Sequence, residues 1–242
     1  RVATIILDRP ERRNALSLEA LRALRATASE VAADDAVWVV VLTGAGDRAF
    51  CAGADLKERK GMDDSQVKEC VREIRAAVGD IAALPQPTVA ILNGHAFGGG
   101  LEMALACDLR VMDEEAQVGL PETSLAIIPG AGGCVRLPRL VGVARAKELI
   151  LLARRLGSEE ALRIGLLNHL VPASELRAKT MEMATLIAKN NQASVIGIKK
   201  ILLQDMTADL EGMWQNEKDF TKVVKGYGVE DAFPEFIARK GR

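Results

Sequence analysis

The feature that most constrains the fold is an alternation of short aliphatic runs with amphipathic helical stretches in the first half of the chain. Strands are predicted at residues 2–7, 37–43 and 88–92, with shorter ones at 109–112 and 118–120. Between them, apolar residues recur at three- and four-residue steps after Ser17, over residues 64–84 and from the triple glycine at 98–100, which is typical of helices. Strands separated by helices pair in parallel through crossover connections. We therefore expect an α/β core.

The second half is predicted to be almost wholly helical past Pro138. The expected helices cover about residues 142–153, 158–164, 174–189, 193–205, 209–225 and 229–240. No low-complexity linker separates the two halves. We expect a core of residues 1–190, followed by a C-terminal helical segment of residues 191–242.

Charge and cysteine usage exclude several classes of protein. The formal net charge of −1 gives no global basic field for nucleic acid or an anionic membrane. The four cysteines lack C-x-x-C spacing and the two histidines are far apart, so neither a zinc site nor a disulfide framework is predicted. We expect a reducing compartment, with the bacterial cytoplasm favoured and the mitochondrial matrix as the eukaryotic counterpart.

The longest uncharged run, residues 81–101, raises the question of a membrane span. Two prolines and the triple glycine interrupt it, so we interpret it as turn, strand and turn rather than a span. The chain begins at Arg1 rather than Met. We expect it to be trimmed there, which leaves any upstream targeting segment open.

Two stretches rich in small residues are candidates for backbone contacts to a ligand. The first, F-C-A-G-A-D-L-K at 50–57, follows a predicted strand and turn. Its small residues leave the backbone N–H groups open to a ligand. The alternative is that they are small only so that a strand-to-helix turn can pack. The second, N-G-H-A-F-G-G-G-L-E at 93–102, opens a helix with three glycines. Free N–H groups there suit a phosphate or a developing oxyanion. The alternative for Glu102 is that its charge simply complements the positive end of the helix dipole.

The third stretch is G-L-P-E at 119–122, followed by I-I-P-G-A-G-G at 127–133. Glu122 has apolar neighbours in sequence, so loss of solvation should raise its pKa toward neutrality; the alternative is a surface glutamate at a helix start. Two sets of backbone donors with two partly desolvated carboxylates can stabilise an enolate while moving protons. A phosphate-binding fold remains the alternative.

Several blocks, in the same order and at the same spacing, resemble the crotonase superfamily essentially from end to end. They are R-P…N-A-L at 9–16, F-C-A-G-A-D-L-K at 50–57, N-G-x-A-x-G-G-G-L-E at 93–102, C-D-L-R at 107–110, G-L-P-E at 119–122 and I-P-G-A-G-G…R-L-P-R at 128–139. The resemblance implies a spiral of repeated β-β-α turns with a helical C-terminal extension. It also implies assembly as a trimer or a dimer of trimers through that extension.

The same resemblance implies a hydration of enoyl-coenzyme A thioesters. In the matching motifs, the oxyanion hole of the family corresponds to the N–H groups of Ala54 and Gly99, and its two acids correspond to Glu102 and Glu122. By the family pattern, Glu102 activates the water and Glu122 delivers the α-proton. An isomerase or acyl-CoA hydrolase using one glutamate remains the alternative, and no metal or redox cofactor is expected, since coenzyme A is part of the substrate.

Coenzyme A contacts are implied for a further set of positions: Arg13, Ala52, Asp55, Leu56, Lys57, Gly130, Phe236 and Arg239. Two positions depart from the family pattern, because Cys134 and Val135 replace the usual threonine and glutamine, which points to a changed acyl preference. His95 is also unusual in its block, and we interpret it as a packed turn residue.

The stretches A-D-L-K-E-R at 54–59 and L-A-I-I-P-G at 125–130 are similar to the methylglutaconyl-CoA hydratase branch, which includes RNA-binding members. RNA binding in that branch relies on a lysine-rich helix. The matching helix here offers only Arg22 and Arg25 as cations, so we expect no specific RNA role. A methylglutaconyl-CoA hydratase with minor RNA binding stays an alternative function.

Overall fold

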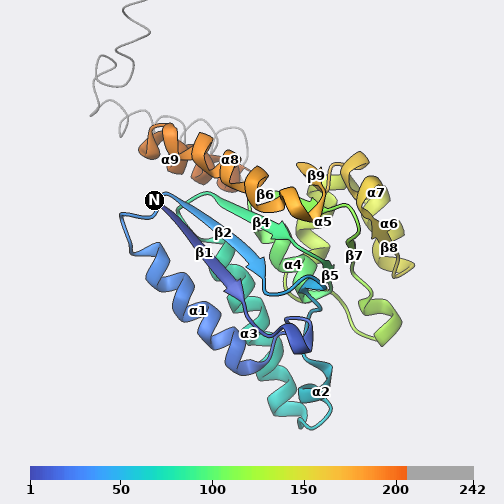
Figure 1. The fold of residues 1–242 in the computed structure, drawn as a ribbon. Helices are drawn as coiled ribbons and strands as arrows, with labels where there is room; N and C mark the ends of the chain where they lie inside the picture. Colours follow the sequence, from blue (N-terminus) through green and yellow to red (C-terminus); the bar gives the residue numbers. More distant parts are fainter. Residues whose placement is uncertain (206–242) are drawn as a thin grey trace, which may run out of the picture. The chain divides into compact units, whose positions relative to one another are not determined.

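A five-stranded parallel sheet forms the larger of two sheets in this computed structural model, which describes residues 1–205 (Figure 1). Its strand order is β1-β2-β4-β6-β9, and every neighbouring pair is parallel. The strands are β1 (Val2–Leu7), β2 (Val39–Gly44), β4 (Thr88–Leu92), β6 (Leu109–Asp113) and β9 (His169–Val171). The near-continuous aliphatic runs of the central strands fit a sheet buried on both faces.

The second sheet has four short strands in the order β3-β5-β7-β8. They are β3 (Ala49–Cys51), β5 (His95–Phe97), β7 (Gln117–Gly119) and β8 (Arg155–Gly157). The first three pair in parallel, and β8 joins β7 antiparallel.

The two sheets are linked by repeated turns of a spiral. The chain passes from β2 to β3 to a helix, then from β4 to β5 to a helix, then from β6 to β7 to a helix. The longer helices that come after β3, β5 and β7 are α3 (Asp64–Ala82), α4 (Gly99–Ala106) and α5 (Gly133–Val141). The expected spiral of β-β-α units is confirmed.

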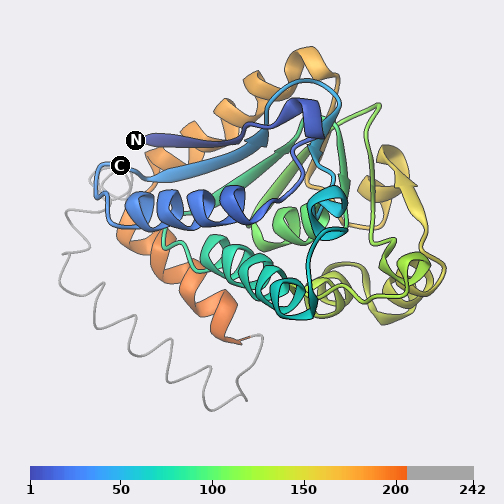
Figure 2. The same cartoon turned by 90° about the horizontal axis from the view of Figure 1, so that it is seen from below.

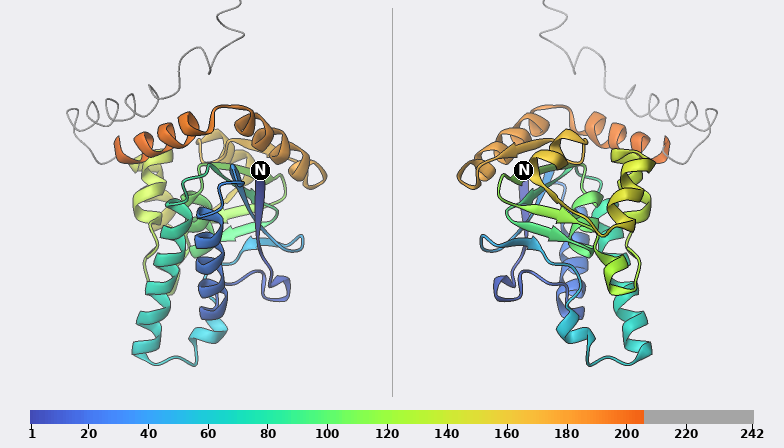
Figure 3. Two further views of the ribbon diagram at one scale, coloured as in Figure 1. Left: turned by 90° about the vertical axis from the view of Figure 1, so that its left-hand side faces the viewer. Right: turned by 90° about the vertical axis from the view of Figure 1, so that its right-hand side faces the viewer.

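Helices α1 (Leu18–Ala32) and α3 lie side by side along one face of the larger sheet (Figures 2 and 3). Ser17 caps α1 by accepting a hydrogen bond from the Ala20 N–H, and Asp63 forms a capping box with Gln66 at the start of α3. Arg25 of α1 donates to Glu73 and Asp80 of α3. Arg22 of α1 likewise pairs with Glu69. Both cations of α1, the helix that matches the lysine-rich helix of the RNA-binding relatives, are therefore bound by acidic side chains.

The core is aliphatic, as the low aromatic content requires. Fully buried side chains such as Leu42, Leu92, Met103 and Met112 fill the space between the large sheet and the helices, and Phe50 is the aromatic member of this set. Helix α4 is buried along its whole length after Gly99. The residues of α4 are therefore held rigidly, which matters because Glu102 belongs to this helix.

The prediction of an almost wholly helical second half missed two strands. Strands β8 and β9 lie within it, each only three residues long, and α5 begins at Gly133 rather than past Pro138. Three-residue strands give too short a pattern to show an alternation in sequence. For the same reason β3 and β5 were not predicted, nor was the short helix α2 (Leu56–Arg59).

Other helices of the second half were predicted within a few residues. They are α6 (Val143–Leu151), α7 (Ser158–Arg163), α8 (Leu176–Lys189) and α9 (Gln192–Asp205). The helices expected at 209–225 and 229–240 lie outside the described residues. Among the described residues, Arg1–Ala184 form one compact unit, and residues 185–205 belong to a second unit. Within residues 1–205, no helix combines the length and apolar character needed to cross a membrane.

Candidate active site

Three loops that follow adjacent parallel strands bring the predicted site residues together. Ala54 follows β3, Gly99 follows β5, and Glu122 follows β7, and these three strands are neighbours in the smaller sheet. The carboxyl ends of parallel strands meet at one edge of a sheet, which is where α/β proteins commonly bind ligands. Glu102 reaches the same place from the first turn of α4.

All four residues line one cavity of about 450 Å³, a size typical of sites for small organic ligands. The remaining wall is mostly apolar and comes from α3 and from residues 126–131. A second cavity of similar volume lies between β1 and α1, but none of the predicted site residues lines it.

Glycines allow the two loops that carry Ala54 and Gly99 to approach closely. Gly53 has φ +87°, and a Cβ there would lie 2.8 Å from the Phe97 carbonyl oxygen and 3.3 Å from the Gly99 nitrogen. Any larger residue at 53 would therefore push the loops apart. Within residues 1–205, neither the Ala54 N–H nor the Gly99 N–H donates to a protein acceptor, so both can donate to a ligand.

Glu102 is buried and held by backbone donors. Its Oε1 accepts hydrogen bonds from the N–H groups of Ala131 and Gly133, both at 2.8 Å. Burial raises the pKa of Glu102 above its usual value, and these two N–H groups oppose that shift. The carboxylate is thus oriented by the loop before α5, and the idea that it only complements its own helix N-terminus is wrong.

Glu122 is also buried, at 6% exposure, so the interpretation as a surface glutamate is wrong. It begins the short 3₁₀ helix η2 (Glu122–Leu125). Loss of solvation raises its pKa to about 7, and the negative charge of Glu102 adds to the effect. Its Oε2 is buried without a hydrogen-bond partner among the described residues. The expected rise in pKa is confirmed.

Five of the residues predicted to contact coenzyme A do not line this cavity. Arg13 is exposed, and its carbonyl accepts from the Ala52 N–H, so these two segments lie together. The Asp55 carboxylate caps α2 and pairs with Arg9. The side chains of Leu56 and Lys57 are exposed on α2. The contacts of all five with the coenzyme stay predictions.

Gly130 does line the cavity, whereas Phe236 and Arg239 lie outside the described residues. Cys134 and Val135 are exposed on α5 and do not line the cavity. His95 belongs to β5, where its Nδ1 accepts a hydrogen bond from the Gln117 N–H. Its interpretation as a packed histidine away from the chemistry is supported by that contact.

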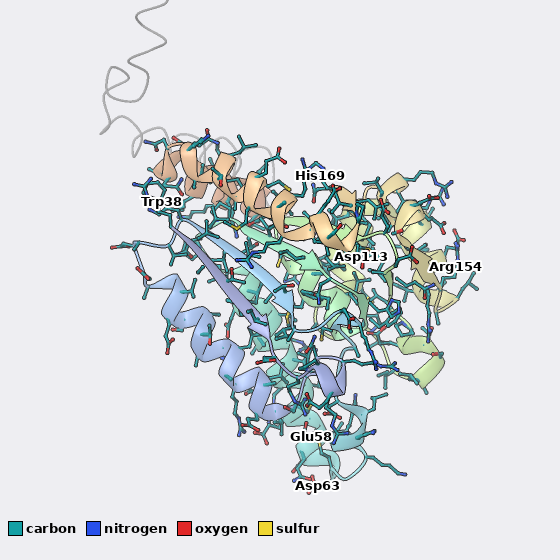
Figure 4. The ribbon with its side chains drawn as sticks, viewed as in Figure 1. Trp38, Glu58, Asp63, Asp113, Arg154 and His169 are labelled. Carbon is teal, nitrogen blue, oxygen red and sulfur yellow. The ribbon has the colours of Figure 1, made fainter. Side chains whose placement is uncertain are left out.

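Several cavity residues were missed from the sequence. Val71, Ile74 and Arg75 line the wall on one face of α3, and Arg59 joins them from the end of α2. The spacing of the α3 residues marks one helix face, but nothing in the sequence says that this face meets residues 126–131. In Figure 4, Glu58, the neighbour of Arg59, lies near the N-terminal end of α1, where it accepts from the Leu18 N–H.

Comparison with known proteins agrees with this arrangement. The family model described as enoyl-CoA hydratase/isomerase matches residues 1–233. A crystal structure of an enoyl-CoA hydratase from Bacillus anthracis superposes with a TM-score of 0.95 at 44% identity, covering 99% of this chain and 93% of that one. The Bacillus subtilis protein YngF is 48% identical over 92% of this chain and 86% of its own length.

A relative with a more specific name is the short-chain-enoyl-CoA hydratase of Clostridium acetobutylicum, which is 36% identical over 99% of this chain and 92% of its own length. The match to the family model and the high structural similarity agree. The chain belongs to the enoyl-CoA hydratase/isomerase family of the crotonase superfamily.

Proposed function

We propose that this protein adds water across the 2,3 double bond of an enoyl-CoA thioester. The observation that carries the proposal is that two buried carboxylates, Glu102 and Glu122, line one cavity with two free backbone N–H groups. An isomerisation or a thioester hydrolysis requires only one such acid. The pair therefore favours hydration, in which one group takes a proton and the other gives one.

The Ala54 and Gly99 N–H groups would hold the thioester carbonyl oxygen. Hydrogen bonding there draws electron density from the double bond, so that the β-carbon becomes electrophilic and the enolate-like transition state is stabilised. Losing one such donor typically lowers kcat by about 100- to 1000-fold. Because these donors polarise the carbonyl, the proposed addition needs neither a metal nor a redox cofactor.

The environments of the two acids support different roles. The N–H groups of Ala131 and Gly133 stabilise the ionised form of Glu102, which suits a base that takes a proton from water as its oxygen attacks the β-carbon. Glu122 has a pKa of about 7 and a free oxygen, which suits an acid that gives a proton to the α-carbon. Proton exchange with solvent then restores both groups.

The first experiment follows the absorbance of crotonyl-CoA together with the mass of the product. Hydration removes the conjugated chromophore and adds the mass of one water to the intact thioester, whereas isomerisation leaves the mass unchanged and hydrolysis releases free coenzyme A. Glu102→Gln and Glu122→Gln should each lower kcat by at least about 100-fold. The matched control is Glu30→Gln, an exposed glutamate on α1. Undiminished turnover in either active-site variant would refute the mechanism.

The proposed substrate class also sets the expected partners. An acyl-CoA thioester binds with its coenzyme along residues 52–57, where small residues leave the backbone open. Assembly of three copies, or of two such trimers, remains part of the proposal. Size-exclusion chromatography with light scattering tests it directly, because a monomer at micromolar concentration would contradict it.

A further inference from the structure

Within residues 1–205, the Glu102 carboxylate is held by backbone groups of one turn and by no side chain. The turn covers residues 130–133, and the N–H groups of Ala131 and Gly133 both donate to Glu102 Oε1 at 2.8 Å. Between them, Gly132 has φ +109°, which lies in the left-handed region. Backbone N–H groups that converge in this way form a concave site for an anion. The position of the carboxylate therefore depends on the shape of this turn.

The side chain of Arg136 binds the same turn from α5. Its Nη1 donates to the Ala131 carbonyl oxygen at 2.9 Å, and its backbone N–H donates to the Gly132 carbonyl oxygen at 2.8 Å. The C=O and N–H groups of a trans peptide point in opposite directions, so a donor at a carbonyl also sets where the N–H of that peptide points. The bond to Gly132 thus directs the Gly133 N–H, and the bond to Ala131 restrains the peptide group before Gly132.

Gly132 makes room for the guanidinium and leaves the turn dependent on it. A Cβ at this position would collide with the Arg136 side chain, whose Cζ it would approach to 3.1 Å. A glycine also gives its own backbone little stiffness. Without the guanidinium, the peptide group between Ala131 and Gly132 would be free to rotate, and the two N–H groups would no longer converge on Glu102.

Arg136 also acts on Glu102 through its charge. The two side chains form no direct hydrogen bond, since each binds the turn instead. Burial raises the pKa of Glu102, and the two N–H groups and the positive charge of Arg136 oppose that rise. The ionised carboxylate is the form that takes a proton from water in the proposed reaction. A positive charge behind the turn therefore favours the reactive form.

Other charged or titratable groups lie around Glu102. They are Glu122 of η2, Arg59 at the end of α2, Arg75 of α3 and Cys134 of α5. Burial raises the pKa of the Cys134 thiol, so it stays neutral near neutral pH. Arg75 is exposed, and water screens its charge, whereas Arg136 is half-buried. We therefore expect Arg136 to act on Glu102 more strongly than Arg75 does.

We infer, building on the proposed hydration, that Arg136 is a positioning residue for Glu102, because it fixes the turn at 130–133 and holds a positive charge behind the carboxylate. Arg136 does not line the cavity, so it touches neither the substrate nor the reacting atoms. Its effect must therefore pass through Glu102, and its loss should slow the reaction rather than weaken substrate binding.

The first measurement is hydration of crotonyl-CoA by Arg136→Met, which removes the charge and the donors at similar length. Because a small misplacement of a catalytic group is costly, we expect kcat to fall by about 10- to 100-fold. KM should change by less than about threefold. Arg136→Lys keeps the charge and should recover part of the loss. The matched control is Arg139→Met, which removes an exposed positive charge three residues further along α5 and should leave both constants unchanged.

A double-mutant cycle with Glu102→Gln separates positioning from a purely structural role. If Arg136 acts through the Glu102 carboxylate, Arg136→Met should lower kcat by less than about threefold in the Glu102→Gln background, because residues that act as a unit are not additive. A structural role would give the same fold loss in both backgrounds. Urea unfolding checks that each variant folds, and Arg136→Lys replaces Arg136→Met in the cycle if the latter does not.

The pH profile of kcat/KM is an independent readout. Its acid limb reports ionisation of the base in the free enzyme. Removing the charge of Arg136 removes a stabilisation of ionised Glu102, so the acid limb of Arg136→Met should lie at higher pH than that of the wild type. Arg136→Lys and Arg139→Met should both keep the acid limb of the wild type.

The outcomes separate this inference from the proposed function. An unshifted acid limb in Arg136→Met, or an equal fold loss of kcat in both backgrounds, would overturn the role of Arg136 and leave the hydratase function intact. If the wild-type protein itself hydrates no enoyl thioester, the hydratase function is refuted.

Discussion

Replacing Glu122 by glutamine should lower kcat by at least about 100-fold and at the same time stabilise the protein at alkaline pH. In the unfolded chain this carboxyl titrates at 4.5, and in the folded protein at about 7 because burial disfavours its charge. The folded state therefore binds the proton more tightly, so that wild-type stability falls as pH rises between these two values. At 1.36 kcal/mol per pKa unit, the full penalty above pH 7 is about 3 kcal/mol.

The assay is urea unfolding of the wild type and Glu122→Gln at pH 5 and at pH 8.5, at one fixed protein concentration because oligomers gain stability from association. Proton linkage predicts that ionisation of Glu122 lowers the free energy of unfolding of the wild type by less than about 1 kcal/mol at pH 5 and by about 3 kcal/mol at pH 8.5. The difference in free energy of unfolding between the variant and the wild type should therefore shift by about 2.5 kcal/mol in favour of the variant from pH 5 to pH 8.5.

Glu30→Gln is the control for a general effect of removing one negative charge, since Glu30 is exposed on α1. A stability difference between wild type and Glu122→Gln that stays constant with pH would refute the reasoning. It would mean that the Glu122 carboxyl titrates alike in the folded and unfolded states, and the argument for it as a proton donor near neutral pH would then lose its physical basis.

Four further outcomes are expected. If protonated Glu122 supplies the α-proton, kcat/KM for crotonyl-CoA should fall as pH rises above about 7; a profile flat to pH 9 would contradict this. Glu102→Ala strands two buried N–H donors and should lower the free energy of unfolding by about 2–4 kcal/mol, whereas Glu102→Gln keeps an acceptor and should cost less than half as much in urea titrations. Gly100→Ala places a Cβ 2.1 Å from the Cys51 carbonyl oxygen and should cost about 3 kcal/mol or more, visible as a lower Tm. Asn14→Ala removes three hydrogen bonds at a buried turn with φ +55° and should cost about 2–4 kcal/mol by the same measurement; a wild-type Tm would be inconsistent with that network.

The local sequence determines much of the frame of this protein. Residues 2–7 and 88–92 carry enough β-branched and aliphatic side chains to specify β1 and β4 with the bounds that the structure shows. Ser17 and Asp63 specify the starts of α1 and α3, since their side chains bind the first free N–H groups of those helices. The apolar residues around Glu122 already indicate a desolvated carboxylate, and the structure confirms it.

Other features depend on contacts between segments far apart in the chain. Strands β3 and β5 have three residues each and no pattern of their own, yet their pairing brings Ala54 and Gly99 to one cavity. The partners of Glu102 are backbone N–H groups at 131 and 133, about thirty positions away, and a backbone donor leaves no mark in the sequence. Arg75 is an ordinary helix cation in the sequence, and only the packing of α3 beside residues 126–131 brings it to the cavity that Glu102 and Glu122 line. Sequence periodicity fixes which face of an element is apolar, but the register between distant elements arises only from packing the whole core, and in this protein that register decided which charges share the cavity.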